Sequence, residues 1–278
     1  MQERPYYSYH PGRHRRRGSR LLILVTLVVV LFVGIILGLS LLVERTTTDS
    51  KMTLEATQQT ASKLDPKVIE TQQLQTAWQQ ALIGHQGDVS IAVYDSTTGA
   101  TAAYATITAT FNTASVVKVS ILEAILVKNQ AKGSNITASQ LAAAREMIQN
   151  SDNDGATTLW LQAGNSKGMN TFFQQLGATQ TTASSTWGQT LTTAKDQLLV
   201  LNAFAYPSTV LNATSAKTVV SLLQGVESDQ VWGVNAGVPD DVSVELKNGW
   251  LPDNQTNDIY SATDTWTITS IGHVHGQG

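Results

Sequence analysis

The chain of 278 residues contains no cysteine, and this absence excludes several kinds of chemistry. It can form no disulfide, offer no thiolate ligand to a metal and use no thiol as a nucleophile. Charged residues make up only 14% of the chain, against 42% hydrophobic residues, a balance typical of a packed core rather than a disordered chain. No repeat or nucleotide-binding loop is present, and we expect no cofactor.

A local absence of charge points to a membrane anchor. Leu21–Val43 is a run of 23 uncharged, mostly apolar residues. As a helix it would be about 34 Å long, enough to cross a hydrocarbon core of about 30 Å. Residues 1–20 contain six arginines and one acid, a formal charge of about +5. The positive-inside rule therefore predicts a cytoplasmic tail at 1–20, a single-pass span in the cell membrane and an extracytoplasmic remainder.

A cleaved signal peptide is the alternative, but the apolar run is long and no A-x-A-like site follows it. Residues 44–65 are polar and rich in threonine, glutamine and serine, which is typical of a linker. The whole chain has a formal net charge of −3, so without the +5 of residues 1–20 the extracytoplasmic part has a net charge of about −8. This negative charge argues against a nucleic-acid partner for that part. We expect residues 66–278 to form the folded domain and to act as a monomer.

The patterns in residues 66–278 predict an α+β fold, with one antiparallel sheet built from both ends of the domain. Strands are predicted at 88–95, 100–107, 242–249 and 265–271. Helices are predicted from Pro66 and at 116–130, 137–149, 156–162, 169–176, 195–205 and 215–224. Residues 178–194 carry many threonines and no charge up to Ala194, which indicates a long loop.

Ser115 and Lys118 lie at the expected start of one of these helices. A serine there is close to free backbone N–H groups and to the positive end of the helix dipole, which stabilise a developing oxyanion. Lys118 follows after three residues, so both side chains leave the same face of the helix. A lysine in an apolar setting can lose its proton near neutral pH and accept the proton of the serine. Alone, the pair is better explained as a capping serine and a solvated lysine.

Two later stretches favour the catalytic interpretation. Ser115-Val-Val-Lys118 is followed in order by Ser151-Asp-Asn153 and Lys247-Asn-Gly249. This set resembles the S-x-x-K, S-D-N and K-[TS]-G motifs of the class A serine β-lactamase and penicillin-binding-protein superfamily. The resemblance runs from about Pro66 to the end of the chain. It implies an acyl-enzyme hydrolase that acts on β-lactams, or on the D-Ala-D-Ala cell-wall peptides that they mimic, without a metal.

The resemblance also assigns roles to individual residues. It makes Ser115, Lys118, Ser151 and Lys247 catalytic, and it places Asn153, Asn248, Gly249 and Trp250 at the substrate. Ser115 would be acylated with Lys118 as its base, and Ser151 would pass a proton to the leaving nitrogen. Lys247 would lower the pKa of the Ser151 hydroxyl and attract a substrate carboxylate. The backbone N–H of Trp250 would be the second oxyanion donor beside that of Ser115, and Asn153 would bind the substrate's amide side chain or cap a helix.

The chain also departs from the family pattern. Class A β-lactamases carry a glutamate in the loop before the third motif, whereas residues 178–194 contain no acid. Asn248 replaces the usual threonine or serine, and Ser115 and Ser151 are only 36 residues apart, which predicts a trimmed helical region. The family's final strand and terminal helix have no counterpart before Gly278, so we expect a C-terminal fragment or another segment in the strand's place.

These departures leave two alternatives to a β-lactamase. The first is a D-Ala-D-Ala peptidase or esterase that turns β-lactams over poorly, because no loop acid activates water. The second is a non-catalytic domain that binds or senses the cell wall.

His273 and His275 alternate along a predicted strand and share a face, as metal ligands would. No third ligand is evident in the sequence, so we predict no metal site and favour two polar residues at a strand end.

Overall fold

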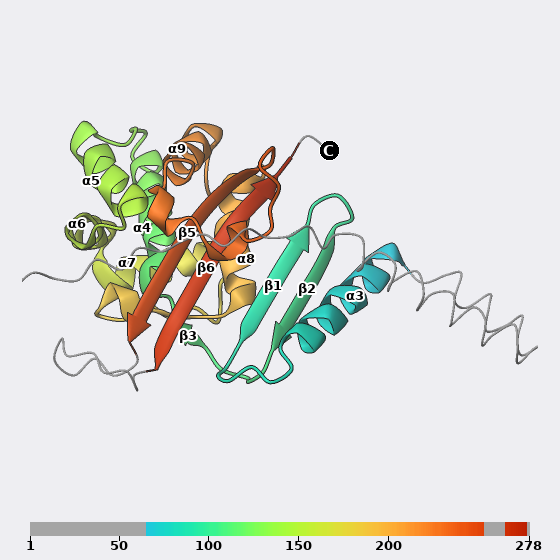
Figure 1. Ribbon diagram of the computed structural model, residues 1–278. Coiled ribbons are helices and arrows are strands. Elements are labelled where there is room, and N and C mark those ends of the chain that lie inside the picture. Colours follow the sequence, from blue (N-terminus) through green and yellow to red (C-terminus); the bar gives the residue numbers. More distant parts are fainter. Residues whose placement is uncertain (1–64, 253–264, 277–278) are drawn as a thin grey trace, which may run out of the picture. The chain divides into compact units, whose positions relative to one another are not determined.

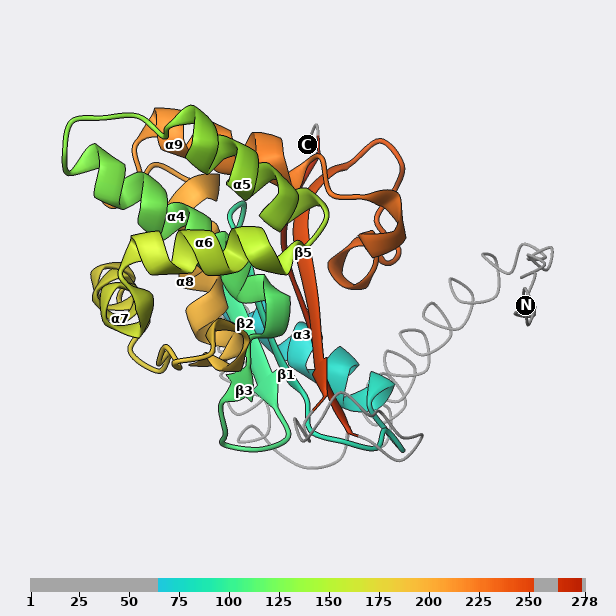
Figure 2. The ribbon, with the colours of Figure 1, turned by 90° about the vertical axis from the view of Figure 1, so that its left-hand side faces the viewer.

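The helix that follows Ser115 lies at the centre of the fold. A computed structural model describes residues 65–252 and 265–276 (Figure 1). In it, helix α4 (Val117–Gln130) buries eleven of its fourteen residues. A helix that is apolar on nearly all sides is stable only when other elements surround it. Its neighbours are α5 (Ala138–Gln149), α6 (Asn153–Ala163), α7 (Asn165–Leu176) and α9 (Ala213–Leu223) (Figure 2).

Side chains cap the starts of several of the helices. Thr137 and Gln140 form a reciprocal capping box at the start of α5. Asp152 accepts a hydrogen bond from the Gly155 backbone N–H at the start of α6. The remaining helices are α3 (Pro66–Ala81), with Asp65 as its cap, and α8 (Ala194–Ala205). The predicted helices are therefore confirmed, with α6 and α7 starting three to four residues earlier than expected.

In residues 65–252 and 265–276, the strands form three antiparallel pairs. They are β1 (Ser90–Asp95) with β2 (Ala100–Ala105), β3 (Phe111–Asn112) with β4 (Leu191–Thr192), and β5 (Ser243–Pro252) with β6 (Trp266–His275). Helix α3 packs on the first hairpin, where Gln75 donates a hydrogen bond of 2.8 Å to the Ala103 carbonyl oxygen. The β3–β4 pair ties the segment before Ser115 to the loop at 178–194, which also contains the 3₁₀ turn η2 (Trp187–Gln189).

The prediction of one continuous sheet is wrong for the residues that the structure describes. No ladder joins β1 to β6, and each hairpin forms its own two-stranded sheet (Figure 1). Helix α8 instead contacts both hairpins. Adjacent strands must lie about 4.8 Å apart to share hydrogen bonds, and the resemblance places a further strand between these two. None of the described residues supplies such a strand between the two hairpins.

Several expectations concern residues outside the described ranges. The cytoplasmic tail at 1–20, the membrane span Leu21–Val43 and most of the linker at 44–65 belong to this group. In the described parts of the chain, no helix has both the length and the apolar character needed to cross a bilayer. The described residues from Asp65 onward form one compact unit.

Glu123 is an unusual member of the central helix. Its side chain is 0% exposed, and neither carboxyl oxygen has a hydrogen-bond partner. Burial raises the pKa of Glu123 well above its usual value, because the ionised form would lose its hydration without compensation. The folded protein therefore keeps this carboxyl protonated in a pH range where the unfolded chain releases the proton.

Glu123→Gln should stabilise the protein in a pH-dependent way. At pH 4 both side chains are mostly neutral in both states, and the free energies of unfolding should be similar. Above the unfolded pKa of about 4.5, the wild type should lose about 1.4 kcal/mol per pH unit until the folded pKa is reached, and the variant should not. Urea unfolding at pH 4 and pH 8 measures the difference, with Glu227→Gln as an exposed control. A difference that does not change with pH would contradict a buried neutral Glu123.

Candidate active site

Ser115 lies in the 3₁₀ turn η1 (Ala114–Val116), which leads directly into α4. The turn is held from two sides: the Thr113 N–H donates to the Thr190 carbonyl oxygen at 2.8 Å, and the Thr269 hydroxyl donates to the Thr113 carbonyl oxygen at 2.9 Å. Ala114 has a φ of +47°, a left-handed conformation that costs a residue with a side chain roughly 1 to 2 kcal/mol. The fold thus holds the serine in a constrained turn at the start of a helix, as the sequence predicted.

Lys118 is buried one helical turn beyond the serine. Its amine donates to the Ser151 carbonyl oxygen, to Ser151 Oγ at 3.2 Å and to Asn153 Oδ1 at 2.9 Å. Burial lowers the pKa of Lys118 to about 8, although the negative charge of Asp152 opposes the shift. Near pH 8, the Lys118 amine is therefore neutral in a substantial fraction of the molecules and can accept a proton.

Lys247 reaches the same hydroxyl from the opposite side. It is 0% exposed on β5, and its amine donates to Ser151 Oγ at 2.9 Å and to the Asn248 carbonyl oxygen at 2.9 Å. Burial, together with the positive charge of Lys118, lowers the pKa of Lys247 to about 7. Both lysines of the motifs thus converge on one serine oxygen from different elements of the fold.

Ser151 is the shared partner of the two lysines. Its φ is +55°, so a second residue with a side chain adopts the left-handed conformation in this site. A hydroxyl has two lone pairs and one proton. Since the lone pairs of Ser151 accept from Lys118 and Lys247, its proton is left for a further acceptor. This arrangement suits a proton relay toward a leaving group.

Gly249 allows β5 to approach the serine turn. A Cβ atom added at Gly249 would lie 2.5 Å from the backbone nitrogen of Ser115 and 2.8 Å from Thr269 Oγ1, so any side chain there would force the elements apart. Trp250 follows, with 47% of its surface exposed and its ring 6.2 Å from that of Trp232. The third motif therefore borders the backbone N–H of Ser115, where an oxyanion would form.

The side chain of Asn248 forms its hydrogen bonds within the protein. It is 0% exposed, and its amide nitrogen donates to the backbone oxygens of Gln230 at 2.7 Å and Trp232 at 3.0 Å. A bond from this amide to a substrate carboxylate would require the internal bonds to break. The predicted substrate contact of Asn248 therefore stays a prediction, and its observed contacts hold the segment at 230–232 against β5.

Sequence reasoning missed the contact between Trp187 and Lys118. The Trp187 ring lies 4.9 Å from the Lys118 amine, and its indole N–H donates to Thr157 Oγ1 at 3.3 Å. The sequence showed a tryptophan in an acid-free loop, but it gave no indication of the face to which the ring turns. In the described structure an aromatic ring, rather than a carboxylate, is the group of this loop that faces Lys118.

Comparisons with known proteins bear on the family and the fold of this chain. Residues 125–260, slightly under half of the chain, match the model of the β-lactamase enzyme family. The match includes the second and third motifs and begins after the first. No curated protein matches the chain significantly.

Solved structures show the same fold at low sequence identity. A representative class A β-lactamase from Bacteroides cellulosilyticus is similar with a TM-score of 0.61 and 15% identity, over 73% of this chain and 83% of that one. The TLA-3 extended-spectrum β-lactamase gives 0.59 and 15%, over 73% and 85%. A variant of PBP-A, solved as an acyl-enzyme complex with penicillin G, gives 0.56 and 17%, over 64% and 77%. These similarities confirm the fold that the motifs implied.

Proposed function

We propose that this chain, which belongs to the β-lactamase and penicillin-binding-protein superfamily, is a serine acyl-enzyme hydrolase that reacts with β-lactams or with the D-Ala-D-Ala peptides that they mimic. The observation that carries the proposal is the convergence of Lys118 and Lys247 on Ser151 beside the Ser115 turn. A purely structural domain has no use for two buried lysines with lowered pKa values.

The reaction follows from the positions of these groups. Neutral Lys118 accepts the Ser115 proton as the serine oxygen bonds to the substrate carbonyl carbon. The negative charge that develops on the carbonyl oxygen is stabilised by the backbone N–H groups of Ser115 and Trp250. When the C–N bond breaks, Ser151 gives its proton to the leaving nitrogen and regains one from the lysines. Asn153 and Lys247 position the amide and the carboxylate of the substrate.

The proposed site favours formation of the acyl-enzyme over its hydrolysis. Hydrolysis needs a base that deprotonates water beside the ester, and residues 178–194 contain no acid. The loop presents the Trp187 ring to Lys118 instead. We therefore expect the enzyme to be acylated by penicillins and to release them slowly, and a peptidase or esterase activity on cell-wall peptides is the second candidate. We further propose that an N-terminal anchor holds the domain outside the cell membrane, based on the charge and apolar pattern at 1–43.

Ser115→Ala should abolish the covalent adduct. Intact-protein mass spectra after incubation with benzylpenicillin should show one added penicillin in the wild type and none in the variant. Ser120→Ala is the matched control, because Ser120 lies on the same helix and its buried hydroxyl has no hydrogen-bond partner. It should retain the adduct in full.

Several outcomes separate the alternatives. The absence of any serine-dependent adduct with penicillins or peptide esters would refute the proposal. Turnover of D-Ala-D-Ala peptides that exceeds turnover of a chromogenic cephalosporin would favour the peptidase. Stoichiometric binding of muropeptides that Ser115→Ala leaves unchanged, without an adduct, would favour a sensing domain.

A further inference from the structure

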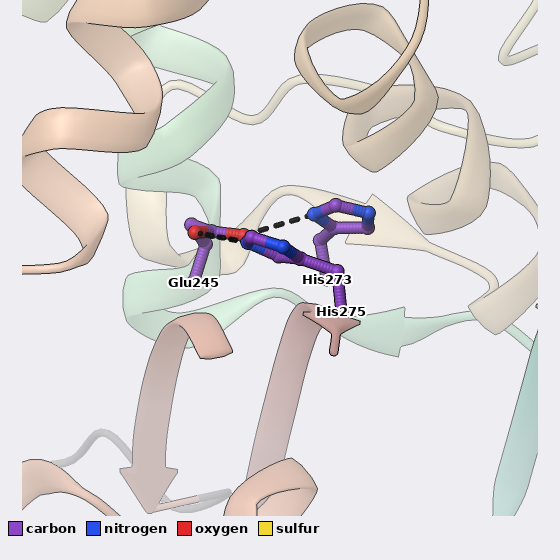
Figure 3. Close-up of side chains that lie close together, drawn as sticks. All are labelled: Glu245, His273 and His275. Atoms are coloured by element: carbon purple, nitrogen blue, oxygen red, sulfur yellow. Dashed lines mark hydrogen bonds and ion pairs between the residues drawn. The ribbon is translucent and has the colours of Figure 1, made fainter. Parts of the chain in front are cut away.

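Three side chains of the β5–β6 hairpin meet in a second cluster, which the proposed reaction does not use. Figure 3 shows the rings of His273 and His275 turned toward the carboxylate of Glu245. His273 Nδ1 lies 2.9 Å from Glu245 Oε2, and His275 Nε2 lies 3.0 Å from Glu245 Oε1. One candidate ligand atom from each residue lies within 4.8 Å of the others. The structure thus supplies the third ligand that the two histidines lacked in the sequence.

The strand register brings these residues together. Glu245 pairs directly with His273 across the hairpin, and His275 lies two residues further along the same face. The two imidazole rings stack at 4.9 Å with an angle of 18°, and the Tyr206 ring packs edge-on against His273 at 5.9 Å. On the carboxylate side, Gln224 donates to Glu245 Oε1 at 2.7 Å. Supporting contacts of this kind orient metal ligands before the ion binds.

The charge balance of the cluster is incomplete. The Glu245 side chain is 0% exposed, and its ion-pair partners among the described residues are the two histidines. Neither partner is a permanent cation, since an imidazole can lose its proton near neutral pH. A buried carboxylate is costly unless it is paired, and a divalent cation held by the same three groups would complete the pairing.

We propose that Glu245, His273 and His275 bind one zinc ion through a carboxylate oxygen and the two ring nitrogens that face the carboxylate group. Two imidazoles and a carboxylate form a ligand set that zinc favours. In a tetrahedral site with metal–ligand distances of 2.0 to 2.1 Å, the ligand atoms are about 3.3 Å apart. The observed nitrogen–oxygen separations of 2.9 and 3.0 Å, each to a different carboxylate oxygen, are slightly shorter than this value, and the three ligand atoms lie within 4.8 Å of one another. The side chains must therefore rearrange around the ion as it replaces the ring-nitrogen protons.

The cluster is partly exposed to solvent, so a zinc ion can reach it. The His275 side chain is 47% exposed and that of His273 is 21% exposed, so solvent reaches both rings, and a water is the expected fourth ligand. The ion would join β5 to β6 two residues before Lys247, whose side chain leaves the same face of β5 as that of Glu245. Zinc should therefore stabilise the hairpin that carries the third motif.

Zinc binding by the full-length chain tests the proposal directly. After treatment with a chelator, the detergent-purified protein should bind one Zn²⁺ per chain in competition with a chromogenic chelator. At one hundred times the dissociation constant, zinc should raise the melting temperature by about 5 to 10 °C. His275→Gln and Glu245→Gln should each lose the binding and the thermal shift, and Co²⁺ should show the visible bands of a four-coordinate site only in the wild type.

The remaining histidines provide the controls. His85→Gln changes an exposed side chain outside the cluster, and the double variant His10→Gln/His14→Gln removes the other two histidines of the chain. Both should bind zinc as the wild type does. Metal-free melting curves show whether His275→Gln still folds. Binding that persists in folded His275→Gln, or that disappears with His10 and His14, would overturn the proposal.

Discussion

Lys118→Met should lower the rate of Ser115 acylation by penicillin by about two to four orders of magnitude, the usual contribution of a positioned base. Methionine has a similar length and apolar stem, but its sulfur cannot accept the serine proton at neutral pH. The Lys118 amine is fully buried and donates hydrogen bonds to Ser151 and Asn153. A lysine from the protein surface therefore cannot take its place as the base. The rate of adduct formation, followed by mass spectrometry under single-turnover conditions, measures the effect.

The pH dependence of acylation gives this prediction a second readout. Because burial lowers the pKa of Lys118 to about 8, the wild-type rate should rise with pH and level off above about 8. The variant should lack that inflection. Lys128→Met is the matched control, since Lys128 is an exposed lysine on the same helix. An unchanged rate in folded Lys118→Met would show that another group takes the serine proton.

The proximity of Lys118, Ser151 and Lys247 could be anticipated from the sequence because each part of this arrangement is encoded locally. Ser115 and Lys118 are one helical turn apart, and Asp152 caps the helix that begins beside Ser151. Lys247 and Gly249 alternate on one strand, so a strand prediction already places them on one face. The hydrogen bonds of both lysines to Ser151 show that these parts meet in space, and the chemical roles of the residues stay predictions.

Other features depend on pairings between distant residues, which local patterns do not specify. The partner of His273 is Glu245, 28 residues away, and only the register of β5 against β6 brings them together. Asn248 was judged by comparison with a family motif, but its amide binds the segment at 230–232. The prediction of a single sheet was wrong for the same reason. The positions of strands along the sequence do not show whether two hairpins are hydrogen-bonded to each other.

The loop beside the serine turn allows a direct test of why the acyl-enzyme should be hydrolysed slowly. Thr113, two residues before Ser115, donates its backbone N–H to Thr190, and its hydroxyl donates to the Gly188 carbonyl oxygen at 3.5 Å. Trp187 stands next to this contact with its ring over the Lys118 amine. A carboxylate at position 187 would thus lie close to both the acylated serine and the lysine.

Trp187→Glu should increase the rate of deacylation by about two to four orders of magnitude, because a carboxylate near the ester can take a proton from the attacking water. The same charge should raise the pKa of Lys118 and slow acylation below pH 8. Loss of the half-buried ring should lower the free energy of unfolding by about 1 to 3 kcal/mol. Stopped-flow acylation and the decay of the penicillin adduct measure the two rates separately.

Trp187→Gln isolates the contribution of the carboxylate, since it removes the same ring and places a neutral side chain of glutamate's size over Lys118. It should share the loss of stability and keep the slow deacylation. If both variants release penicillin at the same increased rate, the gain comes from water admitted by the missing ring and not from a base. If neither does, the absence of an acid in this loop is not what limits hydrolysis, and the persistence of the acyl-enzyme must come from the way the ester is held beside Lys118 and Ser151.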